Sequence, residues 1–143
     1  MNSLIAIALS QFGVKEIKGA EDHPQIINYF TSLGYSKTKY KEETAWCSAF
    51  VNWVAKQAGY IRSNQLNAKS WLTIGVSTNT PEPGDVVVLW REQPNSWKGH
   101  VAFLIKESKR YVYLLGGNQG NSVSIKAYPK NRVLDYRRLQ KNG

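Results

Sequence analysis

The spacing of apolar residues changes near Pro81, where helical periodicity gives way to short runs of strand length. Before that point, apolar residues recur at intervals of three and four, which predicts amphipathic helices. The first predicted helix runs from Ser3, a residue that can cap it, to Gly13. The second begins at Pro24, which suits a first helical turn, and stops at Gly34.

The third helix has the clearest pattern, because its apolar residues keep a 3.6-residue spacing up to Gly59. We expect it to begin near Thr44, which can cap it, and we expect a shorter helix over residues 68–74. The apolar positions of the third helix are Trp46, Ala49, Phe50, Trp53, Val54 and Ala58.

Five segments after the Pro- and Gly-rich turn at 81–85 have strand length and many β-branched or aromatic residues. They cover residues 86–90, 101–105, 111–115, 123–128 and 132–139. Short links between them favour an antiparallel meander. The sequence therefore predicts an α+β fold, with N-terminal helices packed on an antiparallel sheet of about five or six strands.

Composition fits one globular domain over residues 1–143, because 42% of the residues are hydrophobic and 12% are aromatic. A net charge of +9 indicates polyanionic partners, such as nucleic acid, an anionic membrane or a bacterial cell wall. One cysteine and two histidines exclude an internal disulfide framework and do not suggest a structural zinc site.

The apolar run Leu4–Leu9 is too short for a membrane span, and no basic residue precedes it as in a signal peptide. We therefore expect synthesis in the cytoplasm. Any action outside the cell would then require another export device.

Cys47, the only cysteine, falls in the first turn of the third predicted helix. Free backbone N–H groups and the positive end of the helix dipole stabilise a thiolate there, and the same groups can hold an oxyanion. The alternative is that Cys47 is a small core residue beside Trp46 and Phe50.

His100 opens a predicted strand, where its ring can act as a base, although a histidine at a strand end can equally be an ordinary surface residue. The next predicted strand runs into a glycine-rich segment holding Asn118 and Gln119. A side-chain amide can fix the tautomer of a catalytic histidine. The alternative interpretation is that this segment is an ordinary glycine-rich hairpin turn. His23, just before Pro24, reads as a helix-start residue.

Weaker signals allow more than one interpretation. Trp71, Trp90 and Trp97 suit either a glycan groove or the core, and Ser48 is expected on the helix surface. The basic C-terminal positions, which suit either a solvated face or envelope attachment, are Arg132, Arg137, Arg138 and Lys141.

The strings ETAWCSAFVNWVAKQAG, PGDVVVLW, GHVAFLI and LLGGNQGNSVSI, in this order, resemble the NlpC/P60 and CHAP superfamily of papain-like cysteine hydrolases. They look most similar to small single-domain CHAP-like cell-wall hydrolases, including phage endolysins. The resemblance implies a nucleophilic helix packed on an antiparallel sheet and hydrolysis of an amide bond in peptidoglycan. That bond would be the N-acetylmuramoyl-L-alanine bond or one within the stem peptide.

By position, the resemblance makes Cys47 the nucleophile, His100 the base and Asn118 the polar third member, with Gln119 as its alternative. Only one of two adjacent strand residues can face the histidine. Many CHAP domains carry a glutamate two residues before the amide, and here that position is Gly116.

The resemblance also assigns three residues to substrate binding: Glu43, Trp46 and Gln119. Glu43 has the alternative role of a favourable charge at a helix N-terminus. We expect no metal or cofactor, no nucleic-acid partner, no membrane span and a monomer.

The resemblance further suggests a bacteriolytic, antimicrobial enzyme that binds an anionic envelope. It would reach the periplasm or cell wall through a holin or a secretion system. The rival hypothesis is a non-catalytic basic module that binds an anionic polymer, cell wall or nucleic acid.

Overall fold

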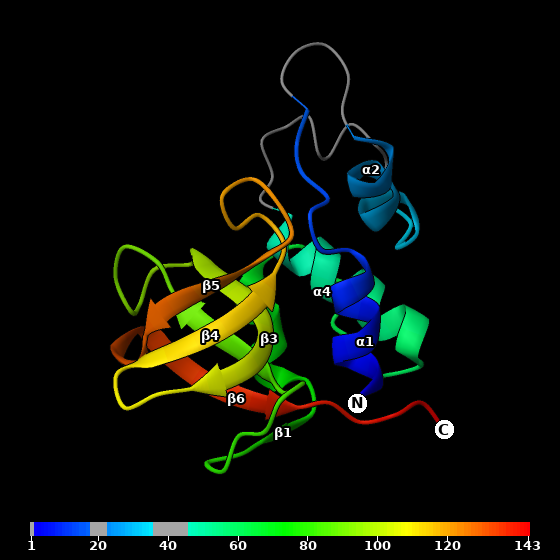
Figure 1. Cartoon of the computed structure of the whole chain (residues 1–143). Coiled ribbons are helices and arrows are strands. Elements are labelled where there is room, and N and C mark those ends of the chain that lie inside the picture. Colours follow the sequence, from blue (N-terminus) through cyan, green and yellow to red (C-terminus); the bar gives the residue numbers. More distant parts are fainter. Residues whose placement is uncertain (1, 18–22, 36–45) are drawn as a thin grey trace.

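The computed structural model describes residues 2–17, 23–35 and 46–143, and it has helices first and strands second (Figure 1). The helical elements are α1 (Ser3–Ser10), α2 (Pro24–Thr31), α4 (Cys47–Ala58) and the 3-10 helix η1 (Ala68–Thr73). The strands, with the 3-10 helix η2 (Lys130–Arg132) before the last of them, are β1 (Val76–Ser77), β2 (Val86–Trp90), β3 (Gly99–Glu107), β4 (Tyr111–Gly116), β5 (Ser124–Pro129) and β6 (Val133–Arg138).

The strands form one six-stranded sheet in the order β1-β6-β2-β3-β4-β5, and every pairing is antiparallel. This confirms the predicted α+β class. The predicted meander is correct for β2 to β5 only, because β6 returns to pair with β2. Three residues of η2 reach only about 10 Å, so the sheet must curl to bring the end of β5 close to β6.

Both faces of the curled sheet carry apolar side chains, and successive residues of β3 point alternately to one face and the other. Val101 and Phe103 belong to the core shared with the helices, whereas Ala102 and Leu104 belong to a second core enclosed by the sheet. His100 has the same parity as Ala102 and pairs with Leu89 of that second core. Its side chain therefore lies at the end of the enclosed face.

The helices pack on the other face, with α4 lying between α1 and the sheet (Figure 1). The predicted Ser3 cap is wrong by one residue, because Oδ1 of Asn2 accepts from the N–H of Leu4 at 2.8 Å. The predicted start of α4 at Thr44 is also displaced: the helix begins at Cys47, and Thr44 lies outside the described residues. Gly59 ends α4 in the left-handed conformation, as expected.

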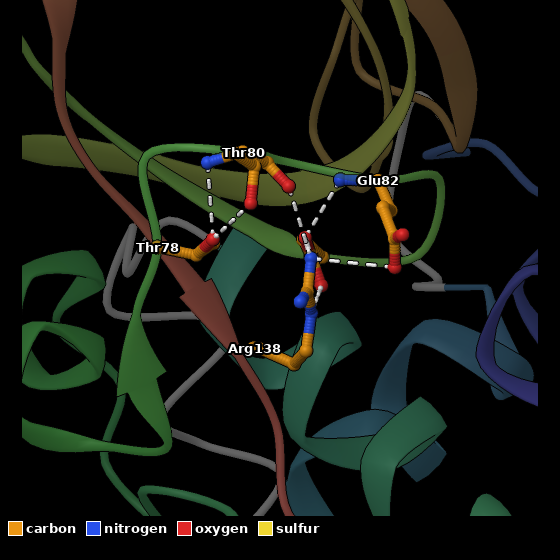
Figure 2. Close-up of polar contacts among 5 residues, drawn as sticks. Thr78, Thr80, Glu82 and Arg138 are labelled. Carbon is orange, nitrogen blue, oxygen red and sulfur yellow. Dashed lines mark hydrogen bonds and ion pairs between the residues drawn. The ribbon is translucent and has the colours of Figure 1, made fainter.

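An ion pair between the buried Asp85 and the partly exposed Arg138 ties the 78–85 loop to β6. Nε and Nη2 of Arg138 donate to the two oxygens of Asp85 at 3.0 and 2.8 Å, and Nη2 also reaches the Thr80 carbonyl at 3.2 Å (Figure 2). Arg137 likewise pairs with Asp135 at 2.9 Å. The two arginines predicted for envelope attachment are thus engaged in intramolecular pairs.

Candidate active site

Cys47 is the first residue of α4 and its side chain is only 3% exposed. Trp46 occupies the cap position without a side-chain hydrogen bond to the helix, and the Phe50 N–H is bonded to the Trp46 carbonyl. The helix start therefore presents first-turn N–H groups without a side-chain cap, next to the sulfur. This is the placement expected for a nucleophile with a nearby oxyanion site.

The β3 residues nearest Cys47 lie outside the ladder between β3 and β4. The register between these strands starts at Phe103 and Leu115, so the preceding residues of β3 extend beyond the ladder on that side. Because Val101 has no partner in β4, its backbone can hydrogen-bond to the Cys47 thiol. Cys47 thus lies against the strand residue that follows His100.

Gly117 allows the chain after β4 to approach the helix start. A Cβ atom at this position would lie 2.8 Å from Cβ of Phe50 and 2.8 Å from Cε3 of Trp46. Real Cβ atoms do not approach other carbons so closely. A glycine here therefore lets the amide-bearing segment pack directly over the nucleophilic helix.

His100 is buried, and its ring is held by two polar groups on its Nε2 side. Nε2 lies 2.9 Å from Oε1 of Gln119 and 3.3 Å from the Tyr128 hydroxyl. The ring of Tyr128 also packs beside the imidazole, with the centroids 5.2 Å apart.

The Gln119 amide has one allowed orientation, because its Nε2 donates to the carbonyls of Leu114 at 3.1 Å and Ser124 at 2.7 Å. Its oxygen must then face His100 and accept a hydrogen bond from the ring Nε2–H. The imidazole is thereby fixed in the Nε2–H tautomer. Its Nδ1 is left free to take a proton from a thiol.

The ring partner is therefore Gln119, and the prediction that Asn118 fills this place is corrected. Asn118 has a left-handed backbone (φ 59°), which breaks the strand alternation at the end of β4. Gly116 allows this arrangement, since a Cβ there would lie 2.7 Å from Oε1 of Gln119 and 2.6 Å from Cβ of Ala102. The family's glutamate would thus not fit with this glutamine conformation.

Burial sets the protonation of the resting site. It lowers the pKa of His100 to about 4, against a weaker raising effect of the Gln119 hydrogen bond, and the charges of Arg91, Arg132 and Lys126 lower it further. Burial also raises the pKa of the Cys47 thiol. It raises the pKa of Tyr128 to about 12, which keeps the phenol protonated. In the resting site the thiol and the imidazole are thus both neutral.

Two of the three residues predicted to bind substrate, Trp46 and Gln119, are buried and engaged in other contacts. Trp46 is 1% exposed, and its indole N–H donates to Glu16 at 2.7 Å, so its side chain is part of the core beneath the site. Gln119 is buried, with its amide engaged as described. Glu43 lies outside the described residues.

A buried network behind Cys47 was not predicted. Ser48, expected on the surface, is fully buried; it donates to the Gln65 carbonyl at 2.6 Å and accepts from the Trp71 indole at 3.0 Å. Nδ2 of Asn52 bonds to the Ser48 carbonyl at 3.0 Å. Two polar residues four apart on the core side of an amphipathic helix are the sequence signal for such a network.

The tryptophans also divide between core and surface. Trp71 is fully buried, whereas Trp97 is 76% exposed. Trp90 is half-buried, and its indole donates to the Asn131 carbonyl at 3.2 Å. Trp71 therefore cannot line a groove.

Two further properties concern the described part of the chain. Within residues 2–17, 23–35 and 46–143, no helix has both the length and the apolar character needed to cross a membrane. In the same residues, His, Cys, Asp and Glu side chains do not gather in threes as a metal site would require.

Comparison with known proteins agrees with the fold. The family model of the CHAP domain matches residues 39–118. A crystal structure of a protein described as similar to a lipoprotein of the NLP/P60 family, from Staphylococcus aureus subsp. aureus Mu50, is 17% identical with a TM-score of 0.53. The match covers 98% of this chain and 41% of that one, so this chain spans less than half of its neighbour and the likeness concerns the fold.

No curated protein matches the chain. The family match covers more than half of the sequence and includes Cys47, His100 and Asn118. The fold is that of the NlpC/P60 and CHAP superfamily. On these grounds, the chain belongs to the CHAP domain family.

Proposed function

We propose that this protein is a peptidoglycan hydrolase that cleaves an amide bond by thiol chemistry. The CHAP and NlpC/P60 families act in general as hydrolases of peptidoglycan. The single observation that carries the proposal is the hydrogen bond of His100 to Gln119, which leaves Nδ1 free on the residue next to the strand position that contacts Cys47. The bond cleaved is either the N-acetylmuramoyl-L-alanine amide or an amide within the stem peptide.

The first half-reaction forms a thioester. The sulfur of Cys47 attacks the carbonyl carbon while Nδ1 of His100 takes the thiol proton. The resulting oxyanion faces the first-turn N–H groups of α4. The C–N bond then breaks, and the imidazolium returns the proton to the leaving amine.

The second half-reaction releases the acyl group. Nδ1 of His100 takes a proton from water as the water oxygen attacks the thioester carbon, and the C–S bond breaks. The proton returns to sulfur, so the neutral pair is restored. Gln119 positions the ring throughout and does not exchange protons.

The cellular setting is part of the proposal. A CHAP-like catalytic domain suits a phage endolysin or a secreted antibacterial effector. Such an enzyme acts in the periplasm or cell wall after release through a holin or a secretion system. The rival is a non-catalytic basic module that binds an anionic polymer.

Digestion of purified sacculi distinguishes the two functions. The wild type should release soluble fragments whose masses show new amine ends, and Cys47→Ala should release none. His100→Ala should lose about 10² to 10⁴ in rate. His23→Ala is the matched histidine control, since His23 only accepts from the Gln25 N–H at 3.0 Å as a helix cap.

Two results would support the rival. One is a wild type that binds sacculi but releases nothing. The other is an equal loss of activity in the two histidine variants, which would leave His100 without a special role.

A further inference from the structure

Two cations lie against the tyrosine that packs on His100. Nζ of Lys126 is 5.3 Å from the centroid of the Tyr128 ring, and the guanidinium carbon of Arg132 is 5.6 Å from it. Arg132 is held in place because its Nε and Nη2 donate to the Trp90 carbonyl at 3.2 and 3.1 Å. These residues come from β5 and η2, which the curl of the sheet brings to the end of β2.

A third cation belongs to the same group. Arg91 follows Trp90, and its N–H donates to the Lys98 carbonyl at 3.3 Å, beside the start of β3. The charges of Arg91, Arg132 and Lys126 all act on His100, and that of Arg91 also acts on Cys47. We call these three residues the cation cluster.

Within the part of the chain that the structure describes, the cation cluster forms no ion pair. Other basic side chains have carboxylate partners: Lys98 pairs with Glu92 at 3.0 Å and Lys130 with Glu107 at 3.3 Å. Lys126 is exposed and Arg132 is half-buried, so both can be reached by a ligand. An unneutralised group of positive charges beside a reaction centre favours an anionic substrate group.

The roles proposed for Cys47 and His100 indicate on which side of the scissile bond the anionic substrate group lies. The sulfur bonds to the acyl carbon, whereas His100 delivers its proton to the leaving nitrogen. The leaving nitrogen therefore lies next to the imidazole, at its Nδ1. Lys126 and Arg132 of the cation cluster lie against Tyr128, whose ring packs beside the same imidazole, so they are placed beside the residue that protonates the leaving half.

A carboxylate held there would also assist the chemical step. The cation cluster disfavours the imidazolium that forms when His100 takes a proton, because like charges repel. A bound carboxylate neutralises part of that repulsion in the transition state. Recognition should therefore raise kcat as well as lower KM.

We propose that Lys126, Arg132 and Arg91 form a carboxylate-binding subsite for the leaving half of the substrate, so that the enzyme prefers stem peptides with a free carboxylate close to the leaving nitrogen. This inference rests on the proposed function, and it adds a specificity that the family assignment does not contain.

The test uses two soluble disaccharide-tetrapeptide muropeptides that differ only in the stem-peptide carboxyls outside the cleaved bond. These are free carboxylates in one substrate and carboxamides in the other. The wild type should cleave the carboxylate form about tenfold faster in kcat/KM, as expected for one charged hydrogen bond. Mass spectrometry of the products identifies the bond cleaved in each.

The variants are Lys126→Gln and Arg132→Gln, with Lys109→Gln as the matched control because Lys109 is exposed in the β3–β4 turn. The first two should reduce the preference to about twofold, chiefly by slowing cleavage of the carboxylate form. The control should keep the full preference. Because Lys126 is exposed, we expect Lys126→Gln to leave the fold intact, so that a change in substrate preference reports on binding.

Three outcomes would overturn the inference. Equal wild-type rates on the two substrates would leave the proposed hydrolase intact and remove the subsite. Equal slowing on both substrates in the Lys126 and Arg132 variants would assign these residues a structural role. Cleavage of neither substrate, together with intact sacculi, would mean that the proposed function itself fails.

Discussion

Replacing Gln119 by alanine removes, within the described part of the chain, the one side-chain amide hydrogen-bonded to the His100 ring. The substitution deletes the 2.9 Å hydrogen bond to Nε2 and the two bonds donated to the Leu114 and Ser124 carbonyls. Only the Tyr128 hydroxyl, 3.3 Å away, then remains near Nε2. Both tautomers of the imidazole become accessible, and the ring is free to turn.

The size of the effect follows from these contacts. One neutral hydrogen bond contributes about 1 kcal/mol net, so its loss shifts the tautomer balance about five- to tenfold, and ring misorientation adds to this. We expect kcat to fall about 10- to 100-fold, with KM nearly unchanged because Gln119 is buried. Three lost hydrogen bonds should lower the free energy of unfolding by about 3 kcal/mol.

Asn118→Ala is the matched control. Alanine at a left-handed position (φ 59°) should cost about 1 kcal/mol of stability but leave kcat within about twofold of wild type. The assay is initial-rate kinetics on a soluble muropeptide, with denaturant unfolding curves for both variants. A larger loss of kcat in Asn118→Ala than in Gln119→Ala would refute the assignment of the ring partner.

Three more predictions concern the surroundings of the site. First, because burial lowers the pKa of His100 to about 4 from 6.5, the acid limb of kcat/KM should lie near pH 4 to 5. Unfolded histidine binds its proton at higher pH than the folded one, so the free energy of unfolding should fall by up to about 3 kcal/mol between pH 6.5 and 4, and a limb at pH 6.5 would contradict the burial argument. Second, Gly116→Ala should displace Oε1 of Gln119, 2.7 Å from the new Cβ, and reproduce the kinetic defect of Gln119→Ala; unchanged kinetics would show that the loop can relax. Third, Lys109→Gln with Arg110→Gln should slow digestion of sacculi and spare a soluble muropeptide, since exposed charges act at long range and are screened beyond about 8 Å at 0.15 M salt; equal effects on both substrates would argue against envelope attachment.

The helices and strands could be predicted well because their signals are local. The 3.6-residue pattern ending at Gly59 located α4, and runs rich in β-branched residues located β2 to β5. The return of β6 to β2 could not be read from such runs, because it depends on the curl of the sheet around its second core.

The sequence indicated candidate residues for the site, but it did not predict which side chains contact one another. Cys47, the only cysteine of the sequence, and His100, one of its two histidines, both stand in strong local contexts. The choice between Asn118 and Gln119 depended on a left-handed residue and on the space left by Gly116, and both are tertiary properties. Tyr128 gave no signal, since nothing near it in sequence indicates that it packs against His100.

The ion pairs of Arg137 and Arg138 show the same limit. Arg137 and Arg138 look like surface charge in a basic C-terminal segment. Their partners, Asp135 and Asp85, are defined by the pairing of β6 and by the path of the 78–85 loop. Net charge alone therefore could not tell which cations face solvent.

The thioester on Cys47 is the most direct test of the proposed mechanism. The wild type is mixed with a soluble muropeptide, quenched in acid within milliseconds to seconds, and examined by intact-protein mass spectrometry with peptide mapping. We expect a transient mass increase equal to the acyl half of the substrate, mapped to Cys47 and missing in Cys47→Ala. Cleavage of the same muropeptide by Cys47→Ala would contradict a catalytic role for this thiol.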